Sequence, residues 1–212
     1  MSGPARVPAI PAAAPPPRKT SPVAPARVAA PPRAVRPPPK PATGLQLARQ
    51  GNLHVSERSK NQVVQISSSR TPIDSPPQDW RVIYYDPKAP YDVIEVQFEG
   101  PQMARVREPT RLRNLFMPSS QKPLDFQKLN IDSDEAQRIA LRIPALEAFT
   151  VRSVQLDLER GYGDLPVWRV RLYGDRGGLD PAAEGALGYA IILAEDGKVL
   201  KETFSKKIPR PK

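Results

Sequence analysis

The chain has 212 residues, 28 of them proline, and carries a formal net charge of +10 with no cysteine. The lack of cysteine excludes disulfides, thiolate nucleophiles and sulfur-ligated metals. With His54 as the only histidine, histidine-based catalytic triads and multi-histidine metal sites are also excluded. We therefore predict no catalytic, cofactor-binding or metal-binding residues, and a protein that is not an enzyme.

Residues 1–44 hold half of the prolines and seven basic side chains, but no acidic one. Their apolar residues are mostly alanine, which buries too little surface to offset the entropy of ordering. We predict a disordered, basic arm that favours polyproline II conformations. The rest of the chain has 25 basic and 22 acidic side chains and is close to neutral. Binding to nucleic acid or an anionic surface would therefore have to occur through the arm.

An internal repeat organises the chain from residue 45 onward. The segments VQI (64–66), WRV (80–82) and YDVI (91–94) recur in the same order as VQL (154–156), WRV (168–170) and YAII (189–192). The WRV motif uses both tryptophans of the protein. Apolar and polar residues alternate in and around each segment, which is typical of half-buried antiparallel strands. Acidic residues such as Glu95 and Asp157 fall on the outward side of these strands, where we expect them to be solvated.

Each copy is predicted to begin with a helix. The first extends from about 45 to 59 and is interrupted by Gly51, while the second is capped by Asp132, has Glu135 in a capping box and ends at Pro144. The last strands are expected at 103–107 and, after an Asp-Gly turn, at 198–204. The fold class is therefore α+β, with two tandem copies of a helix packed on a four-stranded antiparallel meander. The predicted regions are the arm (1–44), the first repeat (45–117), a linker (118–130), the second repeat (131–205) and a basic tail (206–212).

Residues 131–204 resemble a PepSY domain, through DSDEA at 132–136, PVWRV at 166–170 and DGKVL at 196–200. The first copy is similar only through the internal repeat, because it has EGPQM at 99–103 in place of the DGKVL end. The resemblance implies a non-enzymatic bacterial module that binds or inhibits a protein or peptide, as in metalloprotease propeptides. It also implies the cell envelope or secretion, whereas the visible N-terminus has no export signal and favours the cytoplasm if Met1 is the true start.

Two surfaces are candidate binding sites. The outward side of the WRV strands has a row of arginine and tyrosine side chains that suits a peptide or carboxylates; a solvated, salt-bridged face is the alternative. The row consists of Arg81, Tyr85, Arg169, Arg171 and Tyr173. The second candidate is the loop 174–188 with Gly177, Gly178 and Asp180, for which a surface insertion without function is the alternative.

The predicted function is thus binding or inhibition of a protein or peptide partner by a PepSY-like module. The alternative is binding of nucleic acid or an anionic surface through the arm. No stretch of the sequence is apolar enough to predict a transmembrane segment, and the oligomeric state stays open.

Overall fold

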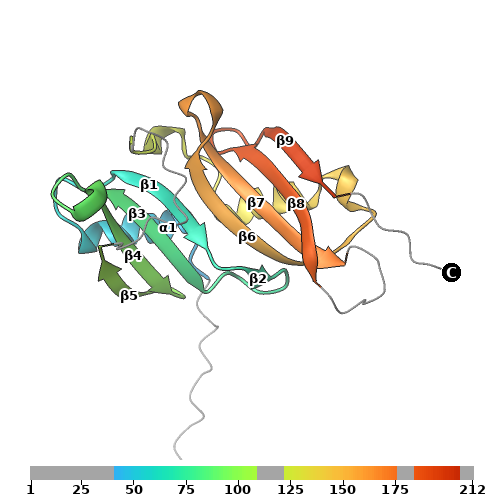
Figure 1. The fold of residues 1–212 in the computed structure, drawn as a ribbon, viewed down its shortest axis with the longest axis horizontal. Coiled ribbons are helices and arrows are strands. Elements are labelled where there is room, and N and C mark those ends of the chain that lie inside the picture. The colour runs from blue at the N-terminus through green and yellow to red at the C-terminus, as the bar shows by residue number, and fades with distance from the viewer. Residues whose placement is uncertain (1–40, 109–121, 176–183, 206–212) are drawn as a thin grey trace, which may run out of the picture. The chain divides into compact units, whose positions relative to one another are not determined.

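The computed structural model describes residues 41–108, 122–175 and 184–205, which all belong to one compact unit. Within these residues, nine antiparallel strands form one sheet in the order β5-β4-β3-β1-β6-β7-β8-β9, and β2 pairs with β6 beside this path (Figure 1). The strands are β1 Val63–Ser68, β2 Thr71–Pro72, β3 Asp79–Tyr85, β4 Val93–Glu99, β5 Gln102–Arg107, β6 Thr150–Arg160, β7 Pro166–Asp175, β8 Gly185–Leu193 and β9 Val199–Phe204. The α+β class is confirmed, but the two predicted meanders are joined in a single sheet.

Two short α-helices lie on one face of this sheet. Helix α1, Gly44–Gly51, packs on β1 and β3, and α2, Ser133–Leu141, packs on β6, β7 and β8 (Figure 1). Neither helix covers the opposite face, which we call the open face. In the described part of the chain, no helix is both long and apolar enough to cross a membrane.

The first helix is shorter than predicted. It ends at Gly51 and continues only as the 3-10 turn Asn52–His54, so the expected extension to residue 59 is wrong. The Tyr84 hydroxyl reaches under the helix and donates to the Ala48 carbonyl oxygen at 2.5 Å. A Cβ atom at Gly51 would lie 2.1 Å from this hydroxyl oxygen, so the packed tyrosine requires the glycine.

The second helix begins directly after Asp132, as predicted, and ends at Leu141, before Pro144. Glu135 forms an ion pair with Arg138 in the next turn, and the predicted capping box is not formed. The Asp132 carboxylate accepts hydrogen bonds from the Ser133 N–H at 2.7 Å, the Leu45 N–H at 3.0 Å and the Thr43 hydroxyl at 2.5 Å. One carboxylate therefore caps both helices, whose N-termini meet.

The hydrophobic core fills the space between the helices and the sheet. As the alternation predicts, Trp80, Val82 and Tyr84 of β3 and Trp168, Val170 and Leu172 of β7 are buried there. The two indole rings converge at Gly44, where a Cβ atom would lie 3.0 Å from the Trp168 ring and 3.2 Å from the Trp80 ring. Both parts of the sheet consequently share one core.

Three predicted segments differ from the structure or fall outside it. Leu124 and Leu129 of the expected linker are buried in the core. The expected loop 174–188 is partly strand, since β7 extends to Asp175 and β8 begins at Gly185. Its residues Gly177, Gly178 and Asp180 lie outside the described residues, as do 1–40 of the arm and the tail.

Candidate binding surface

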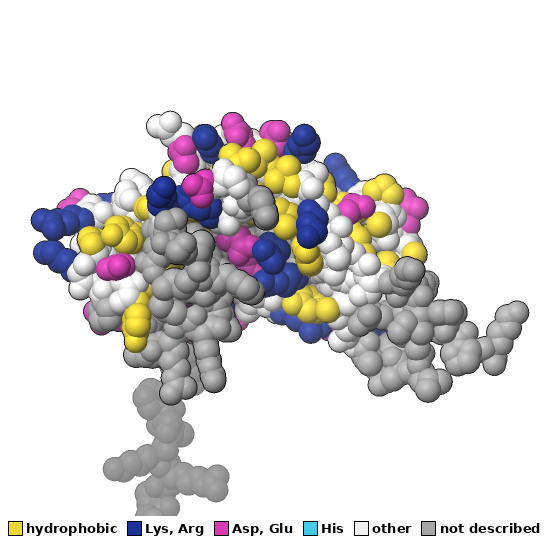
Figure 2. Space-filling view, turned by 45° about the horizontal axis from the view of Figure 1, so that its top comes forward, with side chains coloured by type: hydrophobic (Ala, Val, Ile, Leu, Met, Phe, Trp, Pro, Cys, Tyr) yellow, Lys and Arg dark blue, Asp and Glu magenta, His cyan; other side chains and the backbone are white. Residues whose placement is uncertain are grey.

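A row of paired residues crosses the open face at right angles to the strands. Directly paired residues of neighbouring strands share a face, so the register places these side chains in one line: Arg105, Gln97, Arg81, Ser67, Asp157, Arg169, Ile191 and Lys201. In the view of Figure 2, basic side chains lie beside acidic ones instead of forming a separate basic patch. The surface therefore offers charges of both signs at defined positions.

Asp157 lies at the centre of this row, where β1 and β6 meet. The residue is only 4% exposed, and its Oδ2 accepts a hydrogen bond from Arg171 Nη1 at 2.5 Å. Burial raises the pKa of Asp157, although Arg171, the Ser67 hydroxyl, Arg169 and Arg81 all favour the ionised form. Glu95, also 4% exposed, pairs with Arg107 at 2.9 Å. The expectation that these carboxylates are solvated is wrong.

The three predicted arginines come together around Asp157 but differ in their partners. Arg171 binds Asp157 itself, and Arg169 pairs with Glu159 at 2.6 Å. The Arg169 guanidinium also lies 5.6 Å from the centre of the Tyr189 ring. Arg81 is exposed and makes no ion pair with any residue that the structure describes. It is therefore the arginine of this group that is available to a ligand.

Only one of the two predicted tyrosines lies near this group. Tyr85 is opposite Val93 and four residues along β3 from Arg81, a distance of about 13 Å. The Tyr173 ring lies 4.1 Å from the Arg70 guanidinium, and its hydroxyl donates to Gln155 Oε1 at 3.2 Å. Tyr85 is thus separate from the arginines, whereas Tyr173 is connected to them through Gln155, the cross-strand neighbour of Arg171.

A pocket of about 340 Å³ opens beside Arg81. It forms because β1 leaves β6 after the Ser67–Asp157 pair, so the Leu156 N–H donates to Ser68 Oγ at 2.9 Å instead of to a strand carbonyl. The polar residues that line it are Ser68, Ser69, Asp79, Arg81, Gln97, Glu99 and Gln155. Sequence reasoning missed this pocket, because no local pattern indicates where two strands distant in sequence separate.

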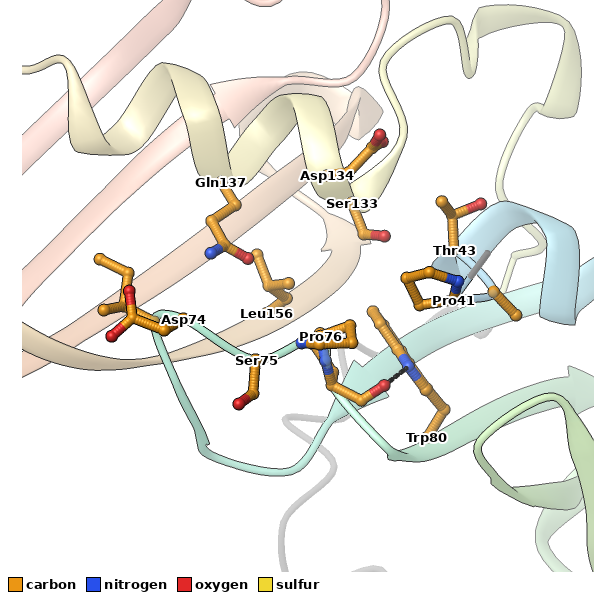
Figure 3. A pocket seen from close by; sticks show the side chains of 13 residues that line it. Pro41, Thr43, Asp74, Ser75, Pro76, Trp80, Ser133, Asp134, Gln137 and Leu156 are labelled. Carbon is orange, nitrogen blue, oxygen red and sulfur yellow. Dashed lines mark hydrogen bonds between the residues drawn. The ribbon is translucent and has the colours of Figure 1, made fainter. Parts of the chain in front are cut away.

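A second, smaller pocket of about 240 Å³ lies between the start of α2, the turn after β2 and Trp80 (Figure 3). Its lining is mainly apolar and includes Pro41, Pro76 and Leu156. The Trp80 Nε1–H donates to the Pro77 carbonyl oxygen at 3.1 Å, so this indole has no free donor for a ligand. The pocket suits an apolar group, and polar side chains such as Asp74, Ser75 and Gln137 also line it.

Chemically, the open face provides fixed guanidinium, carboxylate and amide groups. Among the described residues, no group of three or more His, Asp or Glu side chains is placed to hold a metal ion. Such an arrangement suits reversible recognition of polar or charged groups. Comparisons with protein-family models, curated proteins and solved structures find no match to this chain.

Proposed function

We propose that the protein is a non-enzymatic module that binds a protein or peptide partner on the open face of its sheet. The observation that carries this proposal is the burial of Asp157 and Glu95 on a face that no helix covers. Burying a carboxylate is costly unless it is paired. Here the pairing holds Arg171 and Arg107 in place, and a partner loses less entropy when it binds pre-organised groups.

We also infer that the two parts of the sheet are diverged copies of one PepSY-like unit. Two observations support this inference. When β2 is left out, the strands from the β1–β6 junction to one edge are β1, β3, β4 and β5, and those to the other edge are β6, β7, β8 and β9. In both directions the strands follow one another in chain order. Ser67, which follows VQI, pairs with Asp157, which follows VQL. A residue that pairs with the equivalent residue of the other copy lies on a two-fold axis between the copies. The bound protein or peptide would therefore meet a quasi-symmetric surface, with Arg81 on one side of that axis and Arg169 on the other.

The proposal is tested with peptides selected from a random display library on the full-length protein. Affinities are then measured for the full chain, a chain lacking residues 1–40, and an open-face double variant, Arg105→Glu with Lys201→Glu. Arg49→Glu on α1 is the control, because it reverses an exposed charge on the helix side. We expect binding without residues 1–40, a clear loss in the double variant and no loss in the control.

The opposite pattern would support the arm as the binding element. If the selected peptides require residues 1–40 and lose affinity steeply as salt is raised, the interaction is electrostatic and belongs to the basic arm. The proposal would then be wrong. Equal affinity of the open-face variant and the control would contradict it as well.

A further inference from the structure

Arg81 differs from Arg107, Arg169 and Arg171 in forming no ion pair with a described residue, although its charge favours the ionised form of Asp157. Three neighbouring arginines are each paired with a carboxylate: Arg107 with Glu95 at 2.9 Å, Arg169 with Glu159 at 2.6 Å and Arg171 with Asp157 at 2.5 Å. Arg81 is exposed and lines the pocket of about 340 Å³. Its guanidinium N–H donors are therefore free to bind a carboxylate from outside.

The other end of the same pocket is negatively charged. Asp79 and Glu99 are direct cross-strand neighbours, and both are exposed. Like charges at directly opposite positions are unfavourable, yet neither carboxylate forms an ion pair with a described residue. Asp79 precedes Arg81 by two residues on the same face of β3, so their Cα atoms are about 7 Å apart.

Two glutamine side chains also line the pocket. In each of them one end of the amide, either the NH2 group or the carbonyl oxygen, already forms a hydrogen bond. Gln97 Nε2 donates to Glu95 Oε1 at 2.6 Å, which leaves the Gln97 carbonyl oxygen as an acceptor. Gln155 Oε1 accepts from the Tyr173 hydroxyl at 3.2 Å, which leaves the Gln155 amide as a donor. One acceptor and one donor with fixed orientations are what the main chain of a peptide requires.

We infer that this pocket recognises an extended peptide with an acidic and a basic side chain two residues apart. Side chains at positions i and i+2 of an extended chain lie on the same side, about 7 Å apart, which matches the spacing of Asp79 and Arg81 along β3. The acidic side chain pairs with Arg81 and the basic one with the two carboxylates. This inference rests on the proposed function and specifies the class of ligand that the open face takes.

The test uses full-length protein and four labelled, capped heptapeptides of threonine and serine. They differ only at the third and fifth positions, which are Glu and Lys, Lys and Glu, Glu and Glu, or Gln and Gln. Affinity is measured by fluorescence anisotropy. We expect one of the two mixed-charge peptides to bind roughly tenfold or more tightly than the Gln peptide, because charge-assisted hydrogen bonds are the strong ones. Which of the two binds identifies the direction of the bound chain.

Variants then locate the binding. Arg81→Gln should abolish the advantage of the mixed-charge peptide, whereas Arg49→Gln on α1 removes the same charge from the helix side and should leave it intact. Melting temperatures of both variants should match that of the native chain, since both residues are exposed. The inference is overturned if the four peptides bind equally, if none binds at millimolar concentration, or if Arg81→Gln has no effect. If the display-selected peptides still depend on the open face in these cases, only the pocket assignment fails and the proposed function stands.

Discussion

Replacing the two tryptophans, singly and together, tests whether both parts of the sheet depend on one core. The Trp168 side chain is 0% exposed, and its Nε1–H donates to the Ile131 carbonyl oxygen at 2.8 Å. Trp168→Ala should therefore cost about 3–5 kcal/mol of unfolding free energy, from lost burial and the cavity left behind. Trp80→Ala should cost a similar amount, because Trp80 is 2% exposed.

The two costs should not be additive. Both rings lie against Gly44, within 3.0 and 3.2 Å of where its Cβ atom would be. The second truncation thus removes a ring that already borders a cavity, and the double variant should cost less than the sum of the single ones by about 0.5 kcal/mol or more.

Urea unfolding followed by far-ultraviolet circular dichroism is the appropriate assay, since the double variant has no tryptophan fluorescence. A domain is stabilised by only about 5–15 kcal/mol in total, so a parallel cycle with Trp→Phe keeps the test informative if an alanine variant does not fold. Additivity within about 0.3 kcal/mol in both cycles would refute the shared core. An unchanged urea midpoint for Trp168→Ala would show that its ring is not buried.

Three further changes test single contacts, each by urea unfolding. Asp132→Ala should cost at least the roughly 1 kcal/mol of an ordinary N-cap, because the carboxylate caps two helices; a negligible cost would contradict the shared cap. Gly51→Ala should destabilise the native chain by about 1–3 kcal/mol and the Tyr84→Phe background by less, because the clash is with the hydroxyl oxygen; equal costs would argue against this contact. The pKa of Asp157 is raised in the folded state. The folded protein therefore holds the Asp157 proton more tightly than the unfolded chain, in which an aspartate has a pKa of about 3.9. The free energy of unfolding of the native chain should therefore fall, relative to that of Asp157→Asn, as pH rises from about 4. A difference between the two proteins that does not change with pH would disprove the raised pKa of Asp157.

Local sequence patterns were sufficient to predict eight of the nine described strands, all but the short β2. The alternation around Trp80 and Trp168 correctly places both indoles in the core, and Asp132 correctly marks the start of α2. These features depend on residues within a few positions of one another, because strand alternation and helix capping are local properties. The arginines of the candidate surface were found in the same way, as outward residues of predicted strands.

Only the tertiary structure decided which strands meet at the centre of the sheet. The Ser67–Asp157 pair joins segments far apart in the sequence, and it is this junction that buries Asp157 among three arginines. The pocket beside Arg81 exists because β1 turns away from β6 directly after that pair, and the Tyr84 hydroxyl packs where a Cβ atom of residue 51 would lie. Each of these features depends on packing between distant segments. A periodic pattern reports which face of a strand is apolar, but not which strand will lie beside it.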